Sequence, residues 1–584
     1  MPSIAGRHPD RLVTGGTELK QVQVDSTAEA YIELLASRGV DYFFGNGGTD
    51  FGPIVDAYAK RLEQELPVPK PVTVPHEITA MAMAAGYAMV TRKPQVVMVH
   101  TLPGTANATG GLINARNANV PMLFSAGRTP LTENGTKGSR NGGIHWAQES
   151  RDQGSMVREW VKWDYELRPD VDLEGVVDRA LAITQSEPQG PVYLSLPREV
   201  LAHELESFEY SERPRMQPNL GMASPESIKE VARLLAKAKN PIALTSALGR
   251  DAEAVPQLVK LAELLNLAVY SGGSYMNFPV THPLHQGGMA GPGLSEADVV
   301  LIFEQDVPWM PSAGAGPNES ATVVGIGVDP LYTDYPLRSF PVHVNLTGLP
   351  RYAIGALIEA LNKEKLDQAA IAARGEKHAE NHKKVREAAR GRALAGKEDR
   401  PISKAWASYC FEQLRDENTT VINELGLDPS QFEFTSPEQF YGVSTAGSLG
   451  WGVGAALGCK LAAPERTVVA TIGDGSYMFG VPEAGHWVSR KMNLPVLYVV
   501  WNNSRWNAVQ SATRAVYPEG WQEKTNTYPF SDLSPSLDFE MVCQAAGGYG
   551  ERVEDPAELP AAFERALHAV KVEKRQALLS IVGA

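Results

Sequence analysis

The chain has 584 residues, a formal net charge of −14 and 43% hydrophobic residues. A single hydrophobic core stops growing well below this length, so we expect two to four domains. No stretch comes near the roughly 20 consecutive apolar residues that a membrane-spanning helix needs. The negative charge, without a long basic tract, argues against a nucleic-acid binder, which needs a cationic face to displace phosphate counterions.

The N-terminus and the cysteines give hints about location. Residues 1–23 are polar and contain no apolar segment like that of a secretory signal, so we expect a flexible leader there. Cys410, Cys459 and Cys543 are far apart and form no CxxC motif. Neither a disulfide framework nor a thiolate zinc site is therefore expected. These features favour a reducing, cytoplasmic location.

Short, nearly continuous apolar runs alternate with helical patterns in three segments, residues 24–205, 220–362 and 401–584. Such runs are typical of parallel sheets that are buried on both faces. Residues 363–400 are rich in Lys, Arg, Glu and Ala, which predicts a solvated helix plus linker. We therefore predict an α/β fold of three doubly wound parallel-sheet domains.

The pattern with the clearest chemistry is Gly473-Asp474-Gly475-Ser476, which is separated from Asn503 by a helical stretch and an apolar run. A strand–helix–strand crossover places both strand ends at one edge of a parallel sheet. Asp474 and Asn503 would then offer oxygen ligands to one cation. Magnesium is the expected metal, because it takes few protein oxygens and completes its shell with phosphates and water. The two glycines would let the backbone approach a phosphate, and the amides of the turn would bind it.

This segment resembles the signature of thiamine diphosphate enzymes, in which GDG is followed, after one helix and one strand, by an asparagine pair. The resemblance implies that Asp474, the Asn503 side chain and the Arg505 backbone carbonyl hold magnesium against the diphosphate, with Gly473, Gly475 and Ser476 at the cofactor. Residues 444–452 are similar to the loop that binds the aminopyrimidine ring. There the Gly447 carbonyl would accept a hydrogen bond from the ring, and Leu449 would be the apolar wedge beneath the cofactor.

The helical stretch that starts at His76-Glu77 resembles the helix that carries the catalytic glutamate of these enzymes. Taken alone, a Glu in the first turn of a helix is most often just favourable with the helix dipole. The resemblance implies that Glu77 binds N1′ of the pyrimidine and promotes loss of the thiazolium proton. It also implies a homodimer at least, or a homotetramer, because these enzymes build the site between two subunits.

Two loops resemble those of benzoylformate decarboxylase, residues 44–49 (FGNGGT) and 100–108 (HTLPGTANA). This match implies that Thr49 and His100 are catalytic residues beside the reacting carbon. His100 stands at the end of a predicted strand, where an imidazole could transfer protons. For a histidine taken alone, a structural role is the better interpretation, and both roles stay open here.

Overall order and length resemble the acetolactate synthase large subunit. This implies a 2-oxo acid or acyloin as substrate and a thiamine diphosphate- and magnesium-dependent carboligase or decarboxylase that acts through a carbanion or enamine intermediate. The chain departs from that enzyme at Ala147, where Phe is usual, at Ala512, where Trp is usual, and at 426–431, where GLDPSQ replaces GQHQMW. Branched-chain biosynthesis is therefore not assumed, and FAD is not expected. Val509 stands where pyruvate decarboxylases place a glutamate that assists protonation, which favours carbon–carbon bond formation.

Two other activities stay open: a 2-hydroxyacyl-CoA or oxalyl-CoA lyase, and a simple 2-oxo acid decarboxylase of the benzoylformate decarboxylase type. A non-catalytic subunit is disfavoured, because it would have no chemical need for Glu77, Asp474 and Asn503 together. The donor and acceptor substrates, and the presence of a CoA or FAD/ADP site in the middle segment, are not determined by these patterns.

Overall fold

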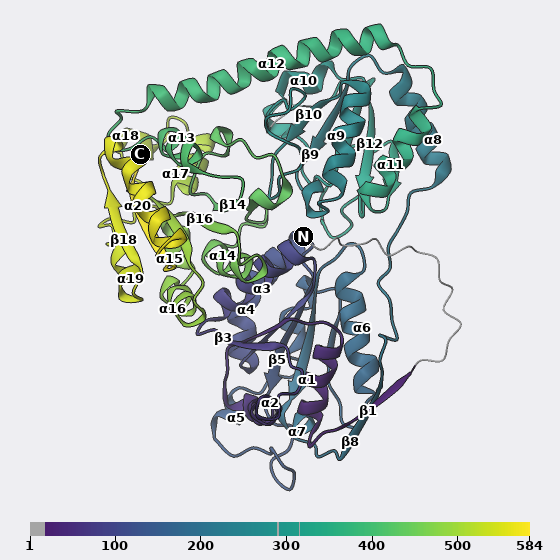
Figure 1. Ribbon diagram of the computed structural model, residues 1–584, viewed down its shortest axis with the longest axis vertical. Coiled ribbons are helices and arrows are strands. Elements are labelled where there is room, and N and C mark those ends of the chain that lie inside the picture. The colour runs from purple at the N-terminus through teal and green to yellow at the C-terminus, as the bar shows by residue number, and fades with distance from the viewer. Residues whose placement is uncertain (1–17, 289–290, 315) are drawn as a thin grey trace.

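The computed structural model describes residues 18–288, 291–314 and 316–584. Within these residues the chain forms three lobes, each built around a parallel sheet with helices packed against it (Figure 1). We call them the N-terminal domain (purple and blue in Figure 1), the middle domain (teal) and the C-terminal domain (green to yellow). The α/β fold of three parallel-sheet domains predicted from the sequence is confirmed, whereas the residue boundaries of the domains stay a proposal.

The strands of each large sheet are parallel to their neighbours. The N-terminal sheet has the spatial order β3 (Lys70–Thr73), β2 (Tyr42–Gly45), β4 (Gln95–Val99), β5 (Met122–Arg128), β7 (Pro191–Pro197), β6 (Asp164–Glu166). The middle sheet has the order β10 (Ala268–Ser271), β9 (Pro241–Thr245), β11 (Val299–Phe303), β12 (Thr322–Gly327), β13 (Val344–Thr347). The C-terminal sheet has the order β15 (Phe440–Gly442), β14 (Thr419–Glu424), β16 (Thr467–Gly473), β17 (Val496–Asn502), β19 (Ala577–Val582), β18 (Tyr549–Val553).

The helices follow the strands in alternation. In the N-terminal domain they are α1 (Thr27–Ser37), α2 (Gly52–Glu63), α3 (Glu77–Thr91), α4 (Thr101–Asn117), α5 (Ile144–Ala147), α6 (Leu173–Gln185) and α7 (Arg198–Leu201). In the middle domain they are α8 (Pro225–Lys237), α9 (Ala254–Leu265), α10 (Gly291–Glu296) and α11 (Pro350–Leu361), followed by the connecting helix α12 (Gln368–Ala395). In the C-terminal domain they are α13 (Lys404–Leu414), α14 (Trp451–Ala462), α15 (Asp474–Phe479), α16 (Pro482–Met492), α17 (Asn507–Val516), α18 (Trp521–Thr525), α19 (Phe539–Ala545) and α20 (Leu559–Lys571).

Burial and capping explain why these segments adopt their structures. Strands β5, β7 and β17 are buried along their whole length, as expected of parallel strands with both faces covered. Ser26, Asp172, Ser224 and Asp367 each accept a backbone N–H in the first turn of the helix that they precede. These caps satisfy amides that have no partner within the helix.

The chain before residue 24 is in part ordered. Leu19–Gln23 form β1, which pairs antiparallel with β8 (Ser207–Ser211). The prediction of a flexible leader up to residue 23 is therefore wrong for residues 19–23, because a second strand distant in sequence satisfies their backbone. Residues 1–17 of that leader lie outside the described residues.

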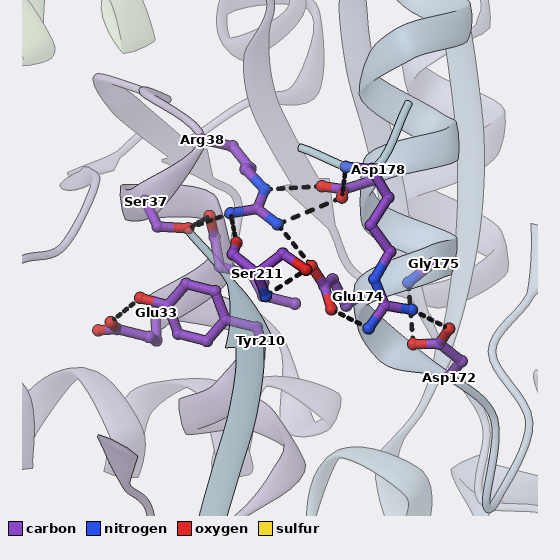
Figure 2. Close-up of polar contacts among 11 residues, drawn as sticks. Glu33, Ser37, Arg38, Asp172, Glu174, Gly175, Asp178, Tyr210 and Ser211 are labelled. Atoms are coloured by element: carbon purple, nitrogen blue, oxygen red, sulfur yellow. Dashed lines mark hydrogen bonds and ion pairs between the residues drawn. The ribbon is translucent and has the colours of Figure 1, made fainter. Parts of the chain in front are cut away.

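A buried ion network lies beside this strand pair and joins α1, α6 and β8 (Figure 2). Arg38 Nε is 2.7 Å from Asp178 Oδ1, and Arg38 Nη2 is 3.0 Å from Glu174 Oε1, with all three side chains at most 1% exposed. Arg38 Nη1 also donates to the Ser211 carbonyl at 2.9 Å. Removing one partner of such a buried pair costs about 3–5 kcal/mol. The network therefore fixes the point at which the chain leaves the N-terminal domain.

Helix α12 spans the top of Figure 1, from the middle domain to the C-terminal domain. Near its start, Arg374 Nε donates to the Leu265 carbonyl at 3.1 Å, and near its end the Ala389 carbonyl accepts from Gln431 Nε2 at 2.9 Å. The helix in the predicted solvated stretch is thus also a strap that contacts both domains. No helix among the described residues is both long and apolar enough to cross a membrane.

The N-terminal and C-terminal domains meet where α3 packs against α14. A Cβ added at Gly458 would lie 2.0 Å from the Met83 carbonyl oxygen, and one added at Gly86 would lie 2.2 Å from the Ala455 carbonyl oxygen. Glycine at these positions allows the two backbones to touch. Met83 and Leu457 consequently belong to one hydrophobic core. This contact brings the motifs of the two domains to one region of the molecule.

Candidate active site

The GDG motif and Asn503 lie at neighbouring strand ends, as the sequence predicted. Strands β16 and β17 are parallel, with Gly473 opposite Trp501. Asp474 Oδ2 accepts the backbone N–H of Asn503 at 3.0 Å and that of Ser504 at 2.6 Å. The crossover between the strands therefore places the Asp474 carboxylate, at the end of β16, against the backbone that follows β17.

The oxygen atoms gathered here suit a hard cation. Asp474 is 4% exposed, and burial raises the pKa of its carboxyl; a cation nearby would favour the charged form. Asn503 Oδ1 accepts from Arg505 N at 3.3 Å, and the Arg505 carbonyl accepts from Asn507 N at 3.0 Å, which leaves each oxygen with a free lone pair. One carboxylate, one amide oxygen and one carbonyl form the kind of donor set that magnesium takes. Among the described residues, no group of three or more His, Cys, Asp or Glu side chains could hold a metal ion.

The glycines of the motif differ in what surrounds them. A Cβ at Gly475 would lie 2.2 Å from the Trp506 ring, so that ring can pack here only against glycine. At Gly473 the nearest atoms are 3.9 and 4.0 Å from an added Cβ, which leaves room for a ligand against the backbone. The sequence predicted a turn at GDGS, but the structure continues these residues into α15, where Ser476 is buried.

The loop before α14 contains Gly447 and Leu449. Gly447 and Gly450 have φ angles of +66° and +84°, in the left-handed region that glycine tolerates best. Leu449 is half-buried. Asn114 of α4 holds the loop from the N-terminal domain, because its Nδ2 donates to the Ser448 carbonyl at 2.7 Å and its Oδ1 accepts from Ser448 N at 3.1 Å.

Glu424, at the end of β14, fixes the start of α14. Its carboxylate accepts the backbone N–H groups of Gly450 at 2.8 Å and of Gly452 at 2.6 Å. It is fully buried, and burial raises the pKa of Glu424 to about 7. The sequence analysis missed this residue, and its only signal was an acidic residue that ends an apolar strand.

Glu77 is the first residue of α3 and is 8% exposed. His76 caps the helix by accepting from Ile78 N at 3.2 Å. The Glu77 carboxylate lies 3.4 Å from Asn107 Nδ2 and 3.9 Å from His76 Nδ1. Both distances are long, so the carboxylate remains able to bind a further partner.

Thr49 and His100 follow the carboxyl ends of the neighbouring parallel strands β2 and β4. Strand β4 ends at Val99, and His100 follows it as the residue that precedes α4. His100 Nδ1 is 2.5 Å from Asp50 Oδ1, and its Nε2 is 3.3 Å from Gln148 Nε2. Thr49 is exposed, and its carbonyl accepts from Arg198 Nη1 at 3.4 Å.

The structure thus forms two polar clusters, one around Asp474 and Asn503 and one around Glu77 and His100. No hydrogen bond or ion pair between described residues joins them directly. Sequence reasoning missed Asp50 and Gln148, although Asp50 directly follows the predicted Thr49.

Comparisons with known proteins agree with this layout. Residues 25–156 match the model of the thiamine pyrophosphate enzyme N-terminal TPP binding domain, and residues 427–580 match that of the C-terminal TPP binding domain. The chain is 26% identical over 562 residues to the acetolactate synthase large subunit of Haemophilus influenzae, with 93% of this chain and 92% of the relative covered. It is 25% identical over 564 residues to benzoylformate decarboxylase of Pseudomonas aeruginosa, with 92% and 96% covered. The crystal structure of benzoylformate decarboxylase from Polynucleobacter necessarius has the same fold, with a TM-score of 0.76 at 23% identity over 96% of this chain and 99% of the other.

The chain therefore belongs to the thiamine pyrophosphate enzymes, whose N-terminal and C-terminal TPP binding domains it contains. It is an enzyme of carbon–carbon bond formation or cleavage. The matched N-terminal range contains Thr49, Glu77 and His100, and the matched C-terminal range contains Leu449, Asp474 and Asn503.

Proposed function

We propose that this protein is a magnesium- and thiamine diphosphate-dependent carboligase or decarboxylase of 2-oxo acids, similar to acetolactate synthase. The observation that carries the proposal is the meeting of Asp474 with Asn503 at the ends of β16 and β17, with 3.0 Å between Asp474 Oδ2 and Asn503 N. Two strand ends that carry oxygen ligands beside an open glycine backbone can hold a metal–diphosphate group.

In this proposal the residues of the C-terminal domain bind and orient. Asp474, the Asn503 side chain and the Arg505 carbonyl hold magnesium, and the backbone at Gly473, Gly475 and Ser476 lies against the diphosphate. The left-handed turn at Gly447 exposes a carbonyl for the pyrimidine ring, and Leu449 supplies the apolar surface beneath it. Glu424 keeps this loop in place by binding the first amides of α14.

The residues of the N-terminal domain handle protons. When bound, thiamine diphosphate supplies the electron sink for the carbon next to the substrate carboxylate. Glu77 holds a proton at the pyrimidine ring, and His100 exchanges protons with the substrate, with Thr49 beside it. Support for Glu77 comes from its position at the start of α3, buried but with only long contacts to the protein.

We further propose that two copies of the chain associate, and that a tetramer forms from such pairs. Support comes from the segment that follows Asn503, where large apolar side chains are exposed: Trp521 is 78% exposed and Phe530 is 97% exposed. In α17 only Gln510 is buried. Large apolar side chains left exposed close together in the sequence favour a protein–protein contact. Light scattering should give at least a dimer, and Phe530→Asp should weaken it.

A simple decarboxylase of the benzoylformate decarboxylase type is the second candidate, and the position of His100 favours it. His100 lies in the stretch that resembles that enzyme, and it has partners on both ring nitrogens. A lyase that acts on CoA thioesters has no such observation in its favour. A cytoplasmic location is part of the proposal, supported by the free, buried Cys410, Cys459 and Cys543.

A panel of 2-oxo acids tests the proposed function. The protein, loaded with magnesium and thiamine diphosphate, should release CO₂ from at least one of them, and mass spectrometry of the products should separate aldehydes from acyloins or acetohydroxy acids. Wild-type protein that releases no CO₂ from any 2-oxo acid, with or without an acceptor aldehyde, would contradict the proposal. EDTA should abolish the activity, and magnesium should restore it.

A further inference from the structure

Asp50 and His100 form a close pair between two elements of the N-terminal domain. Asp50 lies in the 3-10 turn Thr49–Phe51, and its side chain is 3% exposed. His100 follows β4, and its side chain is 20% exposed. The distance from Asp50 Oδ1 to His100 Nδ1 is 2.5 Å, at the short end of charge-assisted hydrogen bonds. A buried carboxylate thus binds the inner ring nitrogen of a partly exposed imidazole.

Two glycines leave the space that this pair occupies. A Cβ at Gly127, in β5, would lie 1.6 Å from Asp50 Oδ2. A Cβ at Gly48 would lie 2.1 Å from His100 Nδ1. Any other residue at either position would displace the carboxylate or the imidazole. The backbone on both sides is therefore shaped around the pair.

Gln148 contacts the other ring nitrogen. Its Nε2 is 3.3 Å from His100 Nε2, while its Oε1 is buried and has no hydrogen-bond partner among the described residues. An amide N–H can donate to a neutral imidazole, and after a half-turn the amide oxygen can accept from an imidazolium N–H. Gln148 can therefore form a hydrogen bond with His100 Nε2 in both protonation states of the imidazole.

The charges around His100 come from four elements. Asp50 faces it from the 3-10 turn and Glu77 from α3; His145 of α5 is close enough to interact electrostatically with His100, and Arg198 of α7 contacts Thr49. The hydrogen bond that His100 donates to the Asp50 carboxylate raises the pKa of His100 and outweighs burial, which acts in the opposite direction.

We propose that Asp50 is a positioning residue that keeps a proton on His100 Nδ1, so that Nε2 is the nitrogen that exchanges a proton with the substrate. As an acid, the imidazolium breaks its Nε2–H bond and gives that proton to the substrate. The neutral imidazole still donates Nδ1–H to Asp50, and a proton from solvent restores Nε2–H. As a base, the neutral Nε2 takes a proton from the substrate and later returns it to solvent. This inference rests on the proposed function, because it places His100 at the substrate.

The direct test measures His100 itself. Histidine C2 hydrogen–deuterium exchange, followed by mass spectrometry over a pH series in protein loaded with magnesium and thiamine diphosphate, gives the titration midpoint of each histidine. In wild type the His100 midpoint should lie above the value of about 6.5 for an unperturbed histidine. In Asp50→Asn, which keeps the shape and removes the charge, it should fall by about one pH unit. Asp56→Asn, the same change at an exposed position of α2, should leave it unchanged.

Activity supplies the second readout. Since Asp50 raises the pKa of His100, the protonated form persists to higher pH in wild type and is lost as pH rises through that pKa. The alkaline limb of kcat should therefore move to lower pH by about one unit in Asp50→Asn, with kcat on that limb reduced by about tenfold and KM little changed. Asp50→Glu, which keeps the charge, should restore part of the shift.

An unchanged His100 midpoint in Asp50→Asn overturns the proposal, as does a wild-type midpoint at or below 6.5. An unchanged pH profile of kcat overturns it as well. The exchange measurement needs no substrate, so it remains decisive if the protein proves inactive on 2-oxo acids, an outcome that would contradict the proposed function instead.

Discussion

The two polar clusters of the site use their carboxylates in different ways. Asp474 accepts backbone N–H groups of Gly475, Asn503 and Ser504, all from its own motif and the adjacent strand end. Asp50 instead binds one imidazole, that of His100, which is 50 residues away in the chain. Backbone donors hold a carboxylate charged and immobile, as a metal site requires, whereas an imidazole partner can lose or gain a proton. The comparison fits the proposal above, in which the cluster around Asp474 holds the metal and the diphosphate, and the cluster around His100 transfers protons.

Removing the carboxylate of the binding cluster should have the largest effect. In Asp474→Ala the metal loses its one charged ligand, so calorimetry should show thiamine diphosphate binding weakened by more than the 10- to 100-fold that an outer-shell mutation costs. Activity should be lost with it. Glu564→Ala, at an exposed carboxylate of α20 in the same domain, is the control, and unchanged affinity in Asp474→Ala would remove the metal assignment.

Glu77→Gln should separate proton transfer from binding. The amide has the shape of the acid, so the variant should fold and bind the cofactor. It should slow exchange of the thiazolium proton by about 10²- to 10⁴-fold, the usual contribution of a positioned acid–base group. NMR in deuterated buffer measures this exchange, with Glu63→Gln on α2 as the control. Exchange at the wild-type rate would assign the role to another carboxylate.

Val509→Glu should bring a proton donor to the cofactor side. Val509 lies on α17 and is 46% exposed in the single chain. With an accepted oxo acid and abundant acceptor, wild type should form more carbon–carbon bonds than free aldehyde, because an apolar residue offers no proton. The glutamate should shift the product ratio several-fold toward aldehyde, as measured by mass spectrometry. Val509→Gln, the control, should leave the product ratio unchanged. If wild type makes almost only aldehyde, the decarboxylase alternative replaces the carboligase proposal.

The smallest expected effect is that of added FAD on the activity. Protein purified without added cofactors should show no flavin absorption band, and adding FAD should not change its activity. The reason is the loss of acetolactate synthase features at Ala147, Ala512 and residues 426–431. One equivalent of bound FAD per subunit would contradict this prediction.

Features that depend on residues close together in the sequence could be predicted from it. The crossover from Asp474 to Asn503 could be predicted because one apolar strand ends directly before Asp474, and a helical stretch and a second apolar strand lead from it to Asn503. The pattern of apolar residues alone predicted the strand β4 and the helix α3. The roles of Gly447, Leu449 and Arg505 came only from resemblance.

Contacts between distant segments could not be predicted. The separations are 50 residues for Asp50 and His100 and 48 for His100 and Gln148, and no local pattern encodes such a pairing. The same holds for Glu424, whose partners start α14 some 26 residues later, and for β1, which pairs with a strand at the far end of the N-terminal domain. These features depend on the three-dimensional arrangement of complete elements.

The glycine-mediated contact between α3 and α14 has a consequence for how the protein melts. Gly86 and Gly458 let the backbones of α3 and α14 touch, and Met83 and Leu457 belong to one core. If either helix unfolded, the apolar face of the other helix would therefore be exposed to water. In a calorimetric scan the N-terminal and C-terminal sheets should therefore unfold in a single transition. Gly458→Val should split that transition in two, because the branched side chain would force the helices apart while each sheet keeps its own strands. The cofactor-binding loop and Glu77 should therefore lose their structure at the same temperature, although they belong to different domains.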